Sequence, residues 1–234
     1  MEYYDPKTRP VALFWDADAL LSAPAELIRS TATTNFSSTL RTLGATDMSP
    51  LVEGDHRHGF KLLHEALPRI MEEPENAALR IDLCAAAFLQ NRAGDDDQGR
   101  RTARDQTGAS AYALATALHI RYHHVWQGES TSCVMPTVTR LTPPENIERA
   151  ARIADALGVW RKGMSSADAA GATADRLDEI YRSIGMPVRI SDVDIPKAEL
   201  PLLAQDTLKN FNANPGNRPD DYVEQMLSLL EAAW

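Results

Sequence analysis

The sequence is poor in the residues that cross-link a chain or anchor it in a membrane. Its two cysteines, Cys84 and Cys133, lie in the apolar segments DLCAAAF and TSCVMP, where a small buried thiol is favoured over a disulfide or a nucleophile. No segment reaches the roughly 18 apolar residues that span a bilayer, and the N-terminal MEYYDPKTRP lacks the pattern of a signal peptide. We therefore expect a cytoplasmic protein with no membrane partner.

Positive charge is also scarce. The chain carries 33 acidic and 24 basic side chains, a formal charge of −9. This sign is wrong for holding a phosphate backbone, so nucleic acid is not expected as a partner. The local exception is the cluster Arg100, Arg101 and Arg104 after three aspartates. We interpret it as a solvated loop between two helices, with an anion-binding loop over a pocket as the alternative.

The alternation of strands and helices that marks a dinucleotide-binding unit is missing, as is the glycine-rich turn that approaches a pyrophosphate. Only one short apolar run, Val11 to Trp15, predicts a strand. The chain has no internal repeat, low-complexity linker or break in composition. These absences predict a single domain over residues 1–234.

Helical periodicity dominates the rest of the chain. Glycines such as Gly158 and Gly185 follow periodic stretches as C-terminal caps, and prolines such as Pro196 precede new ones. The pattern predicts an all-α bundle of about eight helices. Their expected ranges are 24–44, 56–71, 75–92, 107–125, 145–157, 166–184, 197–211 and 219–233.

Three segments resemble one known family. The last fifty residues, from SIGMPVRISD to LLEAAW, are similar to the C-terminal end of the iron-containing alcohol dehydrogenases. The segment HGFKLLHEALPRIMEEPENAALRIDLCAAAFL is similar to a helix pair of the maleylacetate reductases in that superfamily, and VWQGESTSCVMPTVTRL to their LPHAETHTAVLPHALAYN. The matched positions are Gly59, Leu63, Leu67, Pro68, Pro74, Arg80, Glu129, Thr131 or Ser130, Val134 and Pro136. The resemblance covers residues 10 to 234 and implies the helical C-terminal domain of that family.

In that family a preceding α/β domain carries the nicotinamide cofactor. Here RPVALFWDAD, only ten residues from Met1, stands where the family's helical domain begins. A nucleotide domain of roughly 100–150 residues has no room before it. The resemblance therefore implies that the nucleotide domain is absent and that no cofactor is bound.

The resemblance also implies that the family's metal site is lost. The family's metal-binding Asp and His of the first helix fall on Asn35 and Thr39, and later histidines fall on Ala113, Ala117 and Gln127. Alanine offers no lone pair, and neutral amide oxygens are weak ligands for a transition metal.

The remaining histidines leave one alternative open. His119 and His123 are four apart on one helical face and could bind a metal with Glu129 or His64. We favour their interpretation as residues at a helix C-terminus.

The substitutions predict a pocket lined by neutral hydrogen-bonding groups. Tyr112 is the candidate acid, Glu129 the candidate base if burial raises its pKa, and Gln127 a third catalytic residue. The candidate substrate-binding residues are Asn35, Thr39, Thr116 and His123. Alternatively, these side chains only fill the space that the metal and its ligands have left.

Three functions follow as hypotheses. The first is a metal- and NAD-independent enzyme of a specialised, natural-product pathway that acts on a small organic molecule by cyclisation, isomerisation or elimination. The second is a non-catalytic or regulatory helical domain that docks on another chain. The third is a maleylacetate reductase-like enzyme whose nucleotide domain is supplied in trans. Because the former domain interface would expose apolar walls, we expect a homodimer or a separate partner there.

Overall fold

The computed structural model describes residues 10–96, 106–209 and 218–234. This part of the chain contains ten α-helices and several short 3-10 turns, in agreement with the predicted all-α class. The helices are α1 (Ala17–Leu21), α2 (Ala25–Thr42), α3 (Pro50–Ala66), α4 (Ala77–Asp96), α5 (Gln106–Arg121), α6 (Gln127–Leu141), α7 (Ile147–Ala156), α8 (Ser166–Ser183), α9 (Leu200–Asp206) and α10 (Tyr222–Ala233). The 3-10 turns are Leu67–Arg69, Ile190–Val193, Lys197–Glu199 and Thr207–Lys209.

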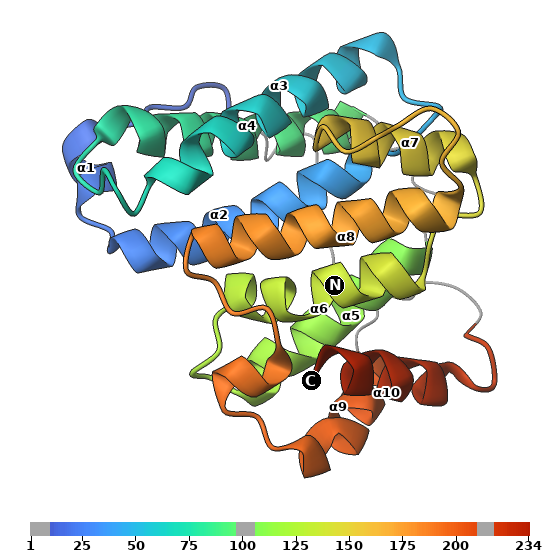
Figure 1. The fold of residues 1–234 in the computed structure, drawn as a ribbon. Helices are drawn as coiled ribbons and strands as arrows, with labels where there is room; N and C mark the ends of the chain where they lie inside the picture. Colours follow the sequence, from blue (N-terminus) through green and yellow to red (C-terminus); the bar gives the residue numbers. More distant parts are fainter. Residues whose placement is uncertain (1–9, 97–105, 210–217) are drawn as a thin grey trace.

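The helices form layers that are visible in Figure 1. The antiparallel pair α3 and α4 lies at one end of the molecule, and α9 with α10 lies at the other. Helices α2, α6 and α8 pack against one another between the two ends, with α5 beside α6. One hydrophobic core runs through these layers, and its largest fully buried side chains include Phe36, Leu63, Leu114, Leu177 and Tyr181.

Helix α6 lies at the centre of the bundle, in contact with α2, α5, α8 and α10. Ten of its 15 residues are buried, including every residue from Ser132 to Thr139. Pro136 and a high content of Ser, Thr and Val lower the helix propensity of this segment. The sequence pattern therefore does not predict this helix.

The predicted strand at Val11 to Trp15 is wrong, because these residues adopt no regular structure and run to the start of α1. A strand needs a neighbour to satisfy its backbone, and the described residues contain no second strand that could pair with it. Val11 and Phe14 are exposed, and Trp15 makes an edge-on contact with Phe88 of α4. The apolar run therefore follows the surface of α4.

Most predicted helices are confirmed with small shifts at their ends. Helix α8 begins after Ser165, whose hydroxyl accepts from the Asp168 N–H at 3.1 Å. Gly185 follows α8 with a φ of 70°, a left-handed conformation that favours glycine. Helix α3 begins six residues earlier than predicted, at Pro50, because Ser49 caps it and proline suits the first turn.

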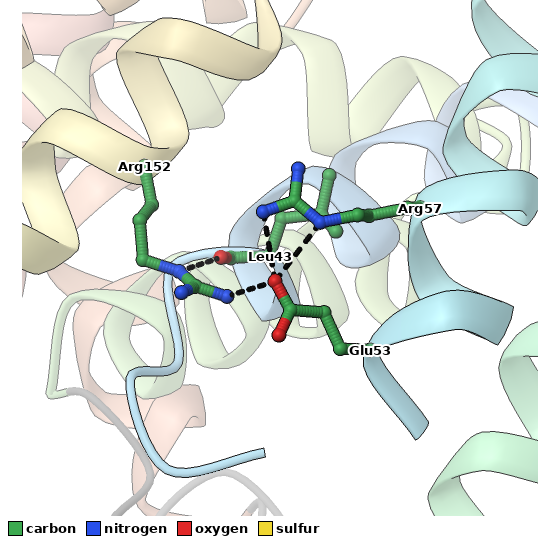
Figure 2. A network of polar contacts seen from close by, with 4 residues as sticks. All are labelled: Leu43, Glu53, Arg57 and Arg152. Atoms are coloured by element: carbon green, nitrogen blue, oxygen red, sulfur yellow. Dashed lines mark hydrogen bonds and ion pairs between the residues drawn. The ribbon is translucent and has the colours of Figure 1, made fainter. Parts of the chain in front are cut away.

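An ion-pair network links three helices near the α2–α3 connection (Figure 2). Glu53 of α3 accepts two hydrogen bonds from Arg57, one turn later, and one at 2.8 Å from Arg152 of α7. Arg152 also donates to the Leu43 carbonyl at the end of α2. Arg57 keeps the pKa of Glu53 below its ordinary value of 4.5, with help from Arg152 and against a smaller effect of burial. The network fixes α7 against the ends of α2 and α3.

The basic cluster Arg100, Arg101 and Arg104 lies outside the described residues. Within the described part of the chain, none of the helices combines the length and apolarity needed to cross a membrane.

Candidate functional site

A pocket of about 590 Å³ opens between α2, α4, α5 and α6. Most of its wall is apolar, formed by residues such as Leu27, Ile28, Leu83, Ala87 and Met135. Many lining residues carry a polar group, although most of the exposed wall area is apolar, and the described lining contains no aspartate or glutamate. The polar lining residues are Thr31, Thr34, Asn35, Ser37, Ser38, Arg41, Arg80, Gln90, Tyr112, Thr116, His119, Gln127 and Thr131.

Helix α5 contributes one continuous stripe to the pocket. Tyr112, Ala115, Thr116 and His119 stand at positions i, i+3, i+4 and i+7, so they share one helical face. Leu114 and Leu118 of the same helix are fully buried in the core. The spacing along α5 therefore places an aromatic hydroxyl, an aliphatic hydroxyl and an imidazole along the pocket.

A close backbone contact holds α6 against α2 beside the pocket. The Gly128 N–H donates to the Ser30 hydroxyl of α2 at 3.1 Å. A Cβ atom on Gly128 would lie 1.9 Å from the Ser30 carbonyl oxygen, so only glycine fits at this crossing. The contact brings Gln127 and Thr131 of α6 to the same pocket as Asn35 of α2.

Four of the seven site residues predicted from the sequence line this pocket: Asn35, Tyr112, Thr116 and Gln127. Tyr112 is 40% exposed and Gln127 is also exposed, so both lie at an accessible part of the wall.

The other three predicted site residues lie away from the pocket lining. Thr39 is fully buried inside α2, and His123 is exposed beyond the end of α5. Glu129 caps α6, where its carboxylate accepts the Trp126 N–H at 2.9 Å. This cap gives Glu129 a structural task at the helix N-terminus.

The sequence reasoning did not select His119 for this pocket. Its Nδ1 lies 3.1 Å from the Ser130 hydroxyl of α6. Burial lowers the pKa of His119 below its ordinary value, and a smaller opposing effect comes from the Ala115 backbone. The signal that predicts His119 is its spacing from Tyr112 and Thr116, because all three share one face of α5.

Two pocket hydroxyls have no hydrogen-bond partner among the described residues. The Oγ1 atoms of Thr34 on α2 and Thr116 on α5 are both shielded from solvent. Buried hydroxyls are normally satisfied, so a bound water or a ligand group is the expected partner.

The two cysteines have different environments. Cys133 is fully buried, and its thiol donates to the Arg189 carbonyl at 3.1 Å. Cys84 of α4 is half-buried and lines the pocket, where burial raises the pKa of its thiol above the ordinary value. Cys84 is therefore a small apolar wall residue with weak nucleophilicity.

Comparison with known proteins identifies the scaffold. A model of the C-terminal part of the Fe-containing alcohol dehydrogenase family matches residues 42–234. The chain belongs to this family. Lactaldehyde reductase of Escherichia coli K12 is 25% identical over 240 aligned positions, which cover 98% of the chain and 57% of that enzyme. Maleylacetate reductase of Sphingobium indicum is 24% identical over 234 positions, covering 96% of the chain and 58% of that enzyme.

Solved structures of iron-containing alcohol dehydrogenases share the helical fold. An alcohol dehydrogenase from Oenococcus oeni superimposes with a TM-score of 0.75 at 22% identity, over 94% of the chain and 54% of that protein. A maleylacetate reductase from Rhizobium sp. strain MTP-10005 gives a TM-score of 0.66 at 16% identity, over 94% of the chain and 55% of that protein. The chain thus spans a little over half the length of these relatives.

The residues present do not fit the iron that the family name implies. The positions that the family resemblance predicts for the metal ligands hold Asn35, Thr39, Ala113, Ala117 and Gln127. Asn35 and Gln127 reach the pocket, whereas Thr39 and Ala113 are fully buried. Among the described residues no group of three or more His, Cys, Asp and Glu is placed to hold a metal ion. Two neutral amides and the imidazole of His119 are a poor donor set for iron.

Proposed function

We propose that this chain binds a small, uncharged and largely apolar organic molecule in the pocket between α2, α4, α5 and α6, and acts on it by a non-redox step without metal or nicotinamide. The observation that most strongly supports this proposal is the pocket itself. Its volume of about 590 Å³ falls within the 300–1,000 Å³ usual for small-molecule sites. Such sites combine a mostly apolar wall with a few convergent polar groups, as this one does.

The charge of the lining supports an uncharged ligand. Two arginines, Arg41 and Arg80, lie in the wall. Arg80 is only 3% exposed, and its guanidinium donates to the backbone carbonyls of Leu20, Ala23 and Pro74, which connects the α1–α2 turn to the start of α4. The described lining offers no carboxylate for a cation, whereas Asn35 and Gln127 suit neutral hydrogen-bonding partners.

Tyr112 is the residue that we assign to proton transfer, because its phenol lines the pocket and stays accessible. A cyclisation, isomerisation or elimination needs proton transfer and a fixed substrate geometry, and both can come from side chains alone. We further propose that this reaction is a step of a specialised biosynthetic pathway. The reason is that the scaffold offers a shaped, mostly apolar pocket even without a metal site.

A binding experiment tests the pocket directly. Naphthalene-sized neutral alcohols and ethers are screened by ligand-observed NMR against the wild type, Thr31→Trp and Leu51→Trp. Thr31 is an exposed lining residue, so tryptophan there should obstruct the pocket, whereas Leu51 is an exposed residue of α3 outside the lining. We expect binding to the wild type and Leu51→Trp and loss of binding in Thr31→Trp. Equal binding to all three proteins would show that the compounds bind elsewhere.

A second experiment tests the chemistry. The ketone 2-tetralone has exchangeable C–H groups, and its proton exchange in D2O can be followed by NMR. We expect the wild type to accelerate the exchange about 10²-fold or more over Tyr112→Phe, the lower end of general acid–base contributions. Equal exchange rates in the two proteins would contradict the assignment of Tyr112.

A second candidate function is a maleylacetate reductase-like reductase that works together with a nucleotide-binding domain. The similarity to maleylacetate reductases over 96% of the chain favours it. The pocket also has exposed apolar side chains in its lining, among them Leu27 at 44% and Tyr112 at 40%, which a second domain or a second copy could cover. Quenching of NADH fluorescence by the purified chain, alone or with a partner from its host, would favour this candidate.

The oligomeric state is part of the proposal. We propose a homodimer formed through the exposed apolar surface around the pocket, since a separate chain would otherwise be needed to cover it. Sedimentation equilibrium at micromolar concentration should give a dimer, and a monomer at that concentration would contradict this arrangement.

A further inference from the structure

We propose that the Nε2 atom of His119 accepts a hydrogen bond from a hydroxyl or N–H group of the ligand, so that the pocket selects molecules that carry such a donor. This inference rests on the proposed binding function of the pocket and names the chemistry that it recognises. The hydrogen bonds of Ser130, the tautomer of His119 and the accessibility of Nε2 together lead to it.

The Ser130 hydroxyl of α6 has two neighbours and a single hydrogen to donate. It lies 2.9 Å from the Gln127 carbonyl oxygen and 3.1 Å from His119 Nδ1. A carbonyl oxygen can only accept, so we assign the hydroxyl proton of Ser130 to Gln127, whose carbonyl oxygen also accepts from the Thr131 hydroxyl at 2.8 Å. With this assignment Ser130 Oγ accepts the second hydrogen bond, from His119 Nδ1.

The tautomer of the His119 imidazole follows from this arrangement. Because Ser130 Oγ accepts, His119 Nδ1 carries the hydrogen and donates it. A neutral imidazole has one N–H and one bare nitrogen, so Nε2 keeps a free lone pair. The lowered pKa of His119 is consistent with a neutral ring near pH 7. The helix turn that contains Gln127 and Ser130 thus selects the tautomer of the histidine.

The surroundings of Nε2 leave it open to a ligand. His119 lines the pocket, where its Nδ1 contacts Ser130 and its ring has a hydrogen bond with the Ala115 backbone, one turn earlier on α5. The ring is half-buried, and Nε2 is not among the solvent-shielded polar atoms that lack a partner. An accessible acceptor in a mostly apolar pocket discriminates against ligands that cannot donate to it.

Packing holds the imidazole in place between α5 and α6. Ser130 is fully buried and His119 is half-buried, so the ring has a fixed neighbour on its Nδ1 side. A purely structural histidine would need only its Nδ1 bond to Ser130. If His119 served only to pack α5 against α6, a free Nε2 on the pocket wall would have no function.

The test compares 2-naphthol, which has a hydroxyl donor, with 2-methoxynaphthalene, which has the same ring system and no donor. We expect the wild type to bind 2-naphthol roughly three- to tenfold more tightly, the range of one net hydrogen bond. Isothermal titration calorimetry or competition fluorescence measures both dissociation constants.

Two substitutions isolate the acceptor. In His119→Asn the amide can still donate to Ser130 from near the position of Nδ1, but the acceptor at Nε2 is lost, so both compounds should bind equally. In His119→Gln the longer side chain can return an oxygen acceptor near Nε2, so part of the preference should return. An unchanged preference in His119→Asn would overturn the inference.

The tautomer can be measured without any substitution. Long-range 1H–15N correlation spectra of the wild type should show His119 protonated at Nδ1, and protonation at Nε2 would overturn the inference. The two proposals fail in different ways. If neither compound binds the wild type, the proposed pocket function fails, whereas equal binding of both compounds removes only the role of His119.

Discussion

Gly128 of α6 and Ser30 of α2 cross so closely that a single methyl group would not fit between them. A Cβ on Gly128 would lie 1.9 Å from the Ser30 carbonyl oxygen, and the Gly128 N–H already donates to the Ser30 hydroxyl. This crossing holds two walls of the pocket at a fixed separation, because Asn35 and Gln127 lie on the same two helices.

Gly128→Ala should therefore force α2 and α6 apart. We expect it to lower the free energy of unfolding by about 1–3 kcal/mol or more, the usual cost of inserting atoms into a packed contact. Gly54→Ala is the matched control, since Gly54 is an exposed position of α3 where an added methyl group would have nothing within 4 Å, and alanine should stabilise that helix by about 0.5–1 kcal/mol. Urea unfolding followed by circular dichroism measures both, and equal stability of the two variants would contradict the close crossing.

The buried hydroxyl pair of Tyr181 and Ser37 provides a second prediction. Their oxygens are 2.6 Å apart, and Ser37 donates to the Thr33 carbonyl, so Tyr181 is the donor of the pair. Burial raises the pKa of Tyr181 and keeps it protonated. Tyr181→Phe should cost about 1–2 kcal/mol of unfolding free energy, and Ser37→Ala a similar amount because the buried phenol loses its acceptor.

The double variant decides whether the two groups interact. Tyr181→Phe combined with Ser37→Ala should cost less than the sum of the single changes, since each single change leaves one buried polar group unsatisfied. Strict additivity in the double-mutant cycle would show that the hydroxyls do not bond to each other.

The network around Glu53 predicts a pH dependence of stability. The folded pKa of Glu53 lies below its ordinary value of 4.5, mainly because Arg57 donates to it. The stabilisation is therefore fully present above the unfolded pKa and is lost as the pH falls through the folded pKa. Because the pair is partly exposed, Glu53→Gln should cost no more than about 1 kcal/mol at pH 7.

The same difference should become smaller as the pH falls below 4.5, and it should also shrink in high salt. Urea denaturation of wild type and Glu53→Gln at pH 7 and pH 3 checks the sign. A difference that grows at low pH would contradict the depressed pKa.

The rate at which a thiol reagent modifies Cys84 should report whether the pocket is occupied. In the native protein a thiol reagent such as DTNB should modify Cys84 slowly, because burial raises its pKa, and should leave the fully buried Cys133 unmodified. Bound 2-naphthol should slow the reaction further. Cys84→Ala serves as the control and should show no native reactivity, and unprotected labelling at saturating ligand would place the ligand outside the pocket.

Much of the bundle could be predicted from sequence, for identifiable physical reasons. Helix α8 is amphipathic and has a serine cap at its start and Gly185 after its end, so its range was predicted within one residue. Helix α6 is not predicted, because Pro136 and the many Ser, Thr and Val residues lower the helix propensity of its sequence. The apolar run at Val11 predicted a strand, although a strand depends on a partner that local sequence does not encode.

The candidate site was predicted in part. Asn35, Tyr112, Thr116 and Gln127 were placed together by the family resemblance, and all four line the pocket. The spacing of His119 from His123 indicates a helix-end or metal-binding residue, whereas its place in the pocket follows from its spacing from Tyr112 on the same face of α5. The cap formed by Glu129 depends on where α6 begins, so that contact could not be predicted before the helix was known.

The measurement that tests the central claim most directly is calorimetric titration of 2-naphthol into EDTA-treated protein, repeated after addition of ferrous iron. We predict saturable binding with one site per chain and the same dissociation constant in both titrations, because the pocket's own side chains supply the recognition. Binding that requires iron, or a chain that takes up one equivalent of iron and then loses its affinity for 2-naphthol, would contradict this claim.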